Sequence, residues 1–187
     1  MSVTCAYCID PPKNCNHHCK GVDCNNYESC HRKLSAIIRI TTKCTQECRH
    51  CCFACSPTQS QMMSIEIAKQ INQFLVRHQF YRINIMGGEF FCHPQWDTII
   101  SILCQNISRI RITTNRDWGN NPAVQEKIIQ LSKQFPIYFA ISKDKYHTNQ
   151  YVQEAEKFCI THQIPYQMAN GEVDNDETIV PVKKGYF

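Results

Sequence analysis

The sequence contains no long apolar run. No segment approaches the ~18 consecutive apolar residues that a membrane-spanning helix needs, and the chain begins with MSVTC rather than with an apolar secretory segment. These absences argue against membrane insertion and against secretion. We therefore expect a cytoplasmic protein without a membrane partner.

A strong excess of positive charge is also missing. The 20 Lys and Arg residues and the 16 Asp and Glu residues give a formal net charge of +4, and the basic residues are scattered rather than arranged in a stripe. Nucleic acid is therefore not an expected partner. Arg109 and Arg111 are predicted to be solvated positions rather than phosphate contacts.

Cysteine, in contrast, is abundant. The chain has 14 cysteines among 187 residues, although a domain of this length can bury a stable core without disulfides. In a reducing cytoplasm, dense cysteine indicates metal or redox chemistry. All but three of the cysteines precede residue 56, and the exceptions are Cys92, Cys104 and Cys159.

From residue 35 onward, the pattern predicts an α/β fold with parallel strands. Ser64 and Asn121 are candidate N-caps of helices, and apolar residues repeat at helical spacing over 96–107 and 151–159. The centres of the last four predicted strands are about 28 residues apart, whereas the centres of the first two are about 45 residues apart. The predicted strands are 36–42, 81–86, 109–114, 136–142 and 164–169.

The long loop after the first strand contains the densest cysteine cluster. Cys44, Cys48 and Cys51 have C-x3-C-x2-C spacing, which lets three thiolates converge on one inorganic centre. A four-iron cluster with three protein ligands keeps one iron open to a substrate or cofactor, as catalytic zinc sites keep an open position. A zinc site is the simpler alternative.

This arrangement resembles the radical S-adenosylmethionine (radical SAM) superfamily, whose signature is C-x3-C-x2-C after the first strand of a partial (β/α) barrel. His50 precedes the third cysteine, where the family commonly has an aromatic residue. Gly87, Gly88 and Glu89 match the family's GGE motif after the second strand. The family uses that motif for the methionyl amine of SAM.

Polar residues at two further strand ends extend the resemblance. Asn115 follows the third strand, and Ser142 and Asp144 follow the fourth, in a stretch similar to the S-x-D-x-x-H of one branch of the superfamily. The resemblance implies contacts with the ribose or carboxylate of SAM. Ordinary helix capping is the alternative for these three side chains.

The resemblance implies a radical SAM enzyme. A [4Fe–4S] cluster on Cys44, Cys48 and Cys51 would be reduced by an external donor of the flavodoxin or ferredoxin type, and would cleave SAM to a 5′-deoxyadenosyl radical. That radical abstracts hydrogen from a peptide, a protein or a small molecule. The alternatives are an activase for a glycyl radical enzyme and a non-catalytic iron–sulfur or zinc module that senses redox state.

Residues 1–34 form a polar, cysteine-rich segment without apolar periodicity. Four of its cysteines would complete a zinc site or an auxiliary iron–sulfur cluster, which would supply the folding free energy that this segment lacks. A tail with reactive thiols is the alternative. Cys52 and Cys55 are either further metal ligands or packed thiols. The six cysteines of the segment are Cys5, Cys8, Cys15, Cys19, Cys24 and Cys30.

Residues 35–187 are predicted to form the radical SAM core. Five strands are evident, and 178–182 is a candidate for a short sixth, but no sixth helix follows before Phe187. An incomplete barrel of five to six strands would leave a wide lateral opening. That opening suits a large substrate or a partner subunit, unless the chain is a truncated form of a longer one.

Overall fold

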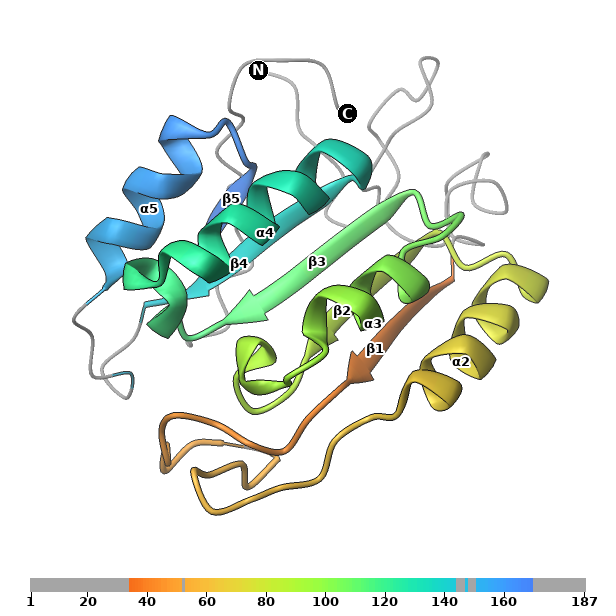
Figure 1. Ribbon diagram of the computed structural model, residues 1–187. Coiled ribbons are helices and arrows are strands. Elements are labelled where there is room, and N and C mark those ends of the chain that lie inside the picture. Colours follow the sequence, from red (N-terminus) through yellow and green to blue (C-terminus); the bar gives the residue numbers. More distant parts are fainter. Residues whose placement is uncertain (1–33, 52, 144–146, 148–150, 170–187) are drawn as a thin grey trace, which may run out of the picture.

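The computed structural model describes residues 34–51, 53–143, 147 and 151–169. Its centre is one sheet of five parallel strands in the order β1-β2-β3-β4-β5 (Figure 1). The first and last strands are not neighbours, so the sheet is open, and the predicted α/β fold of about five parallel strands is confirmed. The strands are β1 (Ser35–Arg39), β2 (Arg82–Met86), β3 (Arg109–Thr114), β4 (Ile137–Ser142) and β5 (Tyr166–Ala169).

Helices connect the strands and cover one face of the sheet (Figure 1). Because each strand pairs with the next one along the chain, successive right-handed crossovers place their helices on the same side. The α-helices are α2 (Ile65–Arg77), α3 (Trp96–Leu103), α4 (Pro122–Gln134) and α5 (Val152–Thr161), and the 3-10 helices are η2 (Phe90–Cys92) and η3 (Asp117–Asn120).

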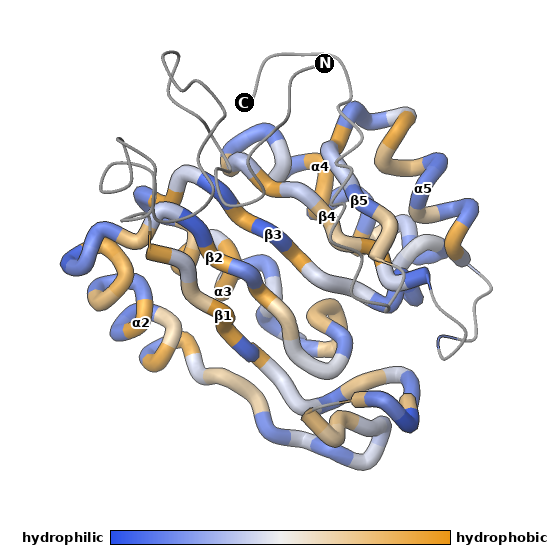
Figure 2. The backbone as a smooth tube through the Cα atoms, turned by 180° about the vertical axis from the view of Figure 1, so that it is seen from behind, coloured by the Kyte–Doolittle hydropathy of each residue, from blue (hydrophilic) through white to orange (hydrophobic). Residues whose placement is uncertain are grey.

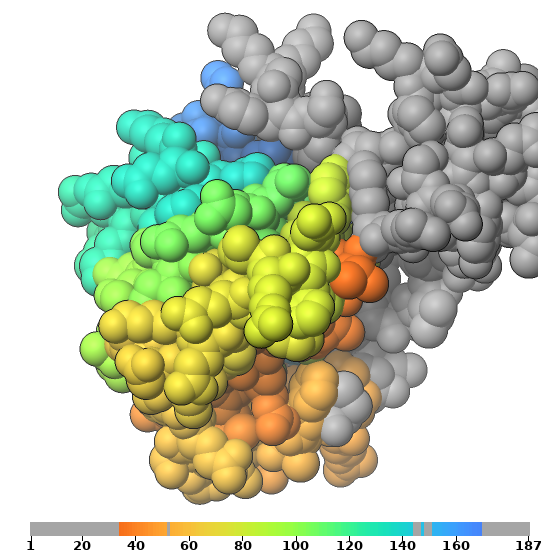
Figure 3. Space-filling model, turned by 90° about the vertical axis from the view of Figure 1, so that its right-hand side faces the viewer, coloured from red at the N-terminus to blue at the C-terminus, as the bar shows by residue number. Residues whose placement is uncertain are grey.

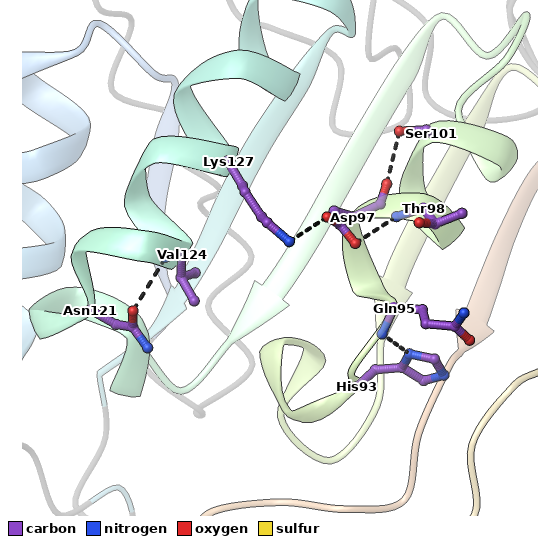
Figure 4. Close-up of polar contacts among 8 residues, drawn as sticks. All are labelled: His93, Gln95, Asp97, Thr98, Ser101, Asn121, Val124 and Lys127. Atoms are coloured by element: carbon purple, nitrogen blue, oxygen red, sulfur yellow. Dashed lines mark hydrogen bonds and ion pairs between the residues drawn. The ribbon is translucent and has the colours of Figure 1, made fainter.

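Two helices begin at the predicted N-caps. The Ser64 side chain accepts a hydrogen bond from the Ile67 amide in α2, and Asn121 accepts one from the Val124 amide in α4. Figure 4 shows the second cap, together with the 2.6 Å contact between Lys127 of α4 and Asp97 of α3. That surface ion pair contributes at most about 1 kcal/mol to stability.

The prediction of one helix over 96–107 is wrong at its end. Helix α3 ends at Leu103, and Asn106 adopts a left-handed conformation with φ of 63°. This turn directs Ile107 into the core, where 4% of the residue is exposed. Ile107 thus shares the burial expected of a helix position without belonging to the helix.

The hydrophobic core lies between the sheet and the helices. Alternate residues of each strand point into it, because successive side chains of a strand alternate between the two faces. Together with Phe90, Trp96 and Leu103 they form one cluster. The strand residues in this cluster include Ile38, Ile83, Ile85, Ile110, Ile112, Ile137, Phe139 and Ile141.

The opposite face of the sheet, which we call the inner face, carries none of the helices of the described residues. Figure 2 views the sheet from this side, with hydrophilic positions in blue along β2 and β3. The prediction that Arg109 is solvated is wrong: it is 7% exposed, and its guanidinium lies 5.3 Å from the centre of the Tyr138 ring. Arg111, on the same strand, is half-buried.

Some predictions concern residues outside the described part of the chain. These are the cysteine-rich segment 1–34, of which only residue 34 is described, the candidate sixth strand 178–182, and residues 52 and 144. Among the residues that are described, no helix is both long and apolar enough to span a membrane.

Candidate active site

A cavity of about 170 Å³ opens at the carboxyl ends of the strands, where parallel α/β folds place their chemistry. Residues from the loop after β1 and from the ends of β2, β3 and β4 meet there. The structure therefore brings together most of the residues that the sequence predicts for the cluster and for SAM. The predicted site residues in its lining are Cys44, Cys48, His50, Cys51, Gly87, Gly88, Asn115 and Ser142.

Backbone pairing holds the cysteine-bearing segment, residues 42–55, which we call the cysteine loop. The Cys44 amide donates to the Ser56 carbonyl at 3.1 Å, and the Cys51 amide donates to the Cys48 carbonyl at 3.0 Å. The first contact closes the base of the loop, and the second forms a tight turn that carries two thiols. Figure 3 shows the segment between β1 and α2, in orange, at one end of the molecule.

The two glycines let the end of β2 lie directly against the cysteine loop. The Gly88 amide donates to the Thr41 carbonyl at 2.8 Å, and the Glu89 amide donates to the Lys43 carbonyl at 2.9 Å. A Cβ atom on Gly88 would lie 2.1 Å from the Lys43 carbonyl oxygen, so no side chain fits there. The glycine pair thus fixes the distance between the end of β2 and Cys44.

Glu89 lies behind the cavity rather than in its lining. The residue is 1% exposed, and its carboxylate accepts 2.7 Å hydrogen bonds from the Thr114 hydroxyl and the Asn115 amide. Burial raises the pKa of this carboxyl group to about 7, although these hydrogen bonds oppose the shift. Its carboxylate therefore ties β2 to β3, while the backbone of Gly87 and Gly88 faces the cavity.

Asn115 joins the end of β3 to the cysteine loop. Its side-chain amide donates to the Thr45 hydroxyl at 2.9 Å and to the Cys44 sulfur at 3.7 Å. The Thr45 hydroxyl in turn donates to the Asp117 carboxylate. Sequence reasoning missed Thr45 and Asp117, because neither belongs to a motif and their contact spans 72 positions.

The sulfur atoms have surroundings that suit an iron–sulfur cluster. The Cys55 amide donates to the Cys51 sulfur at 3.4 Å, and amide donors to the sulfurs are known to tune such clusters. Burial raises the pKa of the Cys44 thiol to about 12, so this thiol needs a metal cation to become the thiolate that ligates.

The spacing of the ligating groups also bears on the kind of metal. No three His, Cys, Asp or Glu side chains in the described residues are placed to hold a single ion. Sulfurs around one tetrahedral zinc lie roughly 3.8 Å apart, given Zn–S bonds of about 2.3 Å. A four-iron cluster assigns each thiolate to a different iron. Cys44, Cys48 and Cys51, which line one cavity, can supply the thiolates for three irons of such a cluster.

Two histidines and a fourth cysteine complete the lining. The rings of His50 and His147 meet edge to face, with centroids 5.3 Å apart. Cys55 is 3% exposed and its thiol lies 3.8 Å from the Phe53 carbonyl oxygen. This position agrees with a packed thiol, one of the two alternatives for Cys55. Asp144 and Cys52 lie outside the described residues.

Relatives with curated names include two proteins of Bacillus subtilis (strain 168). YydG, whose name provisionally assigns it to peptide biosynthesis, is 26% identical over 69% of this chain and 41% of its own length. The antilisterial bacteriocin subtilosin biosynthesis protein AlbA is 30% identical over 44% of this chain and 18% of its own length. The matched part of this chain thus corresponds to less than half of either relative.

Solved structures share the fold at low sequence identity. Native anSMEcpe with bound AdoMet has a TM-score of 0.54 at 13% identity, covering 72% of this chain and 43% of that one. HydG, a maturase of the [FeFe]-hydrogenase, has a TM-score of 0.50 at 12% identity, covering 68% of this chain and 34% of its own. These likenesses support the architecture of the open sheet.

A family comparison completes the assignment. The model of the radical SAM superfamily matches residues 38–162, which include the end of β1, the cysteine loop and strands β2 to β4. This match extends over more than half of the chain and agrees with the predicted family and enzyme class. The chain belongs to the radical SAM superfamily.

Proposed function

We propose that this protein binds a [4Fe–4S] cluster through Cys44, Cys48 and Cys51 and cleaves SAM reductively to form a 5′-deoxyadenosyl radical. The observation that carries the proposal is the cavity in which these three cysteines and the Gly87–Gly88 backbone meet. The cluster, when bound, supplies the electron that breaks the sulfonium bond of SAM. An external one-electron donor of the flavodoxin or ferredoxin type restores that electron.

The chain's own residues orient the reactants and exclude water. The amides of Asn115 and Cys55 donate to the ligand sulfurs. Gly87 and Gly88, which line the cavity, are the proposed backbone contacts of the methionine end of SAM. Ser142 and His50, which line the cavity from β4 and from the cysteine loop, are the proposed contacts of the adenosine end. Asp144 is proposed to join them from the segment after β4.

We propose a peptide as the substrate that gives up the hydrogen atom. The support is that both curated relatives are named for the biosynthesis of peptides, one of them a bacteriocin. The open sheet agrees with this size of substrate, because β1 and β5 do not close a barrel within the described residues. A partner subunit on the same opening is the other arrangement that this geometry accommodates.

Anaerobic reconstitution with iron and sulfide tests the proposal. With dithionite and SAM, the wild type should release 5′-deoxyadenosine, and the variants Cys44→Ala, Cys48→Ala and Cys51→Ala should each lose both the cluster and the product. The matched control is Cys104→Ala, which removes a buried thiol that does not line the cavity. A chain that binds its cluster but never cleaves SAM would instead be a redox-sensing module.

A further inference from the structure

Strand β1 forms an edge of the sheet. The Ile40 amide donates to the Met86 carbonyl at 3.1 Å, so the even-numbered residues of this stretch direct their backbone groups toward β2. Successive residues of a strand direct these groups to opposite sides. Ser35, Ile37 and Arg39 therefore direct theirs away from β2, where none of the other described strands pairs with them. Such an edge is a template for pairing with another strand.

The open edge is short and apolar at its centre. Ile37 is 68% exposed on the inner face, more than any other large hydrophobic residue in the described part of the chain. Lysine, proline and acidic residues, which commonly protect an edge strand, are absent from the sequence of residues 34–40, where Arg39 is the one charged residue. Beyond it, the Met63 amide donates to the Ile40 carbonyl at 2.8 Å, so the chain covers its own edge from there on. The open part is the five residues of β1, or roughly 17 Å.

Helix α2 adds a second apolar surface at the same edge. Its Asn72 side chain donates to the carbonyls of Leu103 and Gln105, so that side of α2 faces the end of α3. Ile67 and Phe74 lie roughly 140° and 160° around the helix from Asn72, and they are 48% and 54% exposed. Figures 1 and 2 show α2 beside β1, at the end of the sheet away from α5. This apolar flank of α2 therefore faces away from α3, on the open side of β1.

We propose that these two surfaces join two copies of this chain, with β1 of one protomer antiparallel to β1 of its partner. A two-fold axis perpendicular to the sheet at Ile37 generates the arrangement, in which each Ile37 lies opposite the partner's Ile37. Each Arg39 then lies opposite the partner's Ser35. The same axis keeps both α2 helices on one side of the joined sheet, with their apolar flanks toward each other.

Complementarity favours a second copy as the occupant of this edge. The register places Arg39 opposite a serine, so no like charges oppose each other. A stable interface buries roughly 1,000 Å² or more, which calls for the helices as well as the strands. A single strand from the same chain or from a peptide would leave Ile67 and Phe74 without a helix to pack on. The candidate strand 178–182 also contains Pro181, which lacks the N–H group of a ladder hydrogen bond.

The dimer leaves both active-site cavities accessible. Each β1 leads into its own cysteine loop, and antiparallel strands have their carboxyl ends at opposite ends of the paired segment. The two cysteine loops therefore lie far apart along the interface, and neither faces the two-fold axis. The inference goes beyond the proposed function, because pairing through β1 needs no SAM cleavage.

Sedimentation velocity of the reconstituted full chain tests the proposal. At about 50 μM, in anaerobic buffer with a thiol reductant that prevents intermolecular disulfides, the wild type should sediment as a dimer. Ile37→Glu places two carboxylates opposite each other and should raise the dissociation constant of the dimer about tenfold or more. Phe74→Gln should raise it about fivefold, because it removes apolar contact between the helices. The matched control is Ile160→Glu on α5, where the isoleucine is 53% exposed, and it should leave the constant unchanged.

Variants of Ser35 test the register itself. Ser35→Glu brings a carboxylate opposite the partner's Arg39 twice in each dimer and should tighten association about threefold or more. Ser35→Arg places like charges there and should weaken association by a similar factor. Adding Arg39→Glu to Ser35→Glu should abolish the gain. Because Ser35 is exposed, misfolding does not account for opposite effects of two charges at one position.

Several results would overturn the inference. These are a wild type that is monomeric at about 50 μM, a dimer that Ile37→Glu and Ile160→Glu weaken equally, and equal effects of Ser35→Glu and Ser35→Arg. A monomer that melts at a lower temperature after Ile37→Glu would instead assign the edge to a segment of the same chain. None of these readouts involves 5′-deoxyadenosine, so a failure of the proposed radical chemistry would not change them.

Discussion

At the scale of single residues, Glu89 makes stability depend on pH. Its folded-state pKa of about 7 exceeds the ordinary value of 4.5, so the folded state holds a proton that the unfolded state has released between those values. Stability is therefore full below pH 4.5 and falls as the pH rises toward 7. We predict a loss of about 3 kcal/mol over this range, which urea unfolding from pH 4.5 to 8 would measure.

The variant Glu89→Gln tests this effect, because its amide carries no charge and its one oxygen can still accept from either Thr114 or Asn115, which donate to different oxygens of the carboxylate. The difference in unfolding free energy between wild type and variant should change with pH below 7 and stay constant above it. A difference that is constant from pH 4.5 to 8 would contradict the assignment of the raised pKa.

Asn115 should tune the electronics of the proposed cluster. Its side-chain amide donates toward the Cys44 sulfur at 3.7 Å, and such donors stabilise the more negative, reduced state. Asn115→Ala should lower the reduction potential of the cluster by about 60 mV. This value corresponds to a hydrogen bond to sulfur that is about 1.4 kcal/mol stronger in the reduced than in the oxidised cluster. Thr45→Val, which leaves the donor to sulfur in place, is the control for redox titration. Equal potentials in Asn115→Ala and wild type would contradict this role.

At the scale of elements, the contact between the end of β2 and the cysteine loop should decide whether the cluster binds. Gly88→Ala places a Cβ atom 2.1 Å from the Lys43 carbonyl oxygen, and we predict a loss of stability above about 3 kcal/mol together with loss of bound iron.

Gly119→Ala is the matched control for this variant. Its Cβ would meet the Tyr151 carbonyl oxygen at 2.9 Å, at the start of α5 and away from the cysteine loop. This variant should lose stability but keep its iron content per folded chain. Thermal unfolding curves would first show how much folded chain each variant contains. Equal iron content per folded chain in the two variants would contradict the role given to Gly88.

The elements themselves were largely predictable from the sequence. Alternation of isoleucines with polar residues predicts β3 as residues 109–114, which is its observed extent, and Ser64 and Asn121 predict two helix starts because capping is a local interaction. The end of α3 was not predictable, since Ile107 is apolar at helical spacing although a left-handed Asn106 precedes it.

The site was predictable only where a motif fixes its residues. The spacing of Cys44, Cys48 and Cys51 and the glycine pair identify residues that do meet in one cavity. The direction of the Glu89 carboxylate and the contact of Thr45 with Asp117 depend on tertiary packing, which leaves no periodic signal. Burial of Arg109 against Tyr138 was unpredictable for the same reason.

At the scale of the whole molecule, the N-terminal cysteines should hold a second metal centre. We propose that the segment 1–34 binds zinc or an auxiliary iron–sulfur cluster through its six cysteines. Cys5→Ala combined with Cys8→Ala should then lower the zinc or iron content per chain, which elemental analysis would measure. Continued formation of 5′-deoxyadenosine would show that the cluster on Cys44, Cys48 and Cys51 is still intact. Unchanged metal content would contradict this proposal.

We propose that three cysteine ligands leave one iron of the cluster open to SAM. Electron paramagnetic resonance of the dithionite-reduced full chain, recorded before and after addition of SAM, tests it most directly. We predict a [4Fe–4S]⁺ signal whose g values change with SAM, and the loss of that signal in Cys48→Ala. A reduced cluster whose spectrum stays the same at saturating SAM would contradict an iron that is open to SAM.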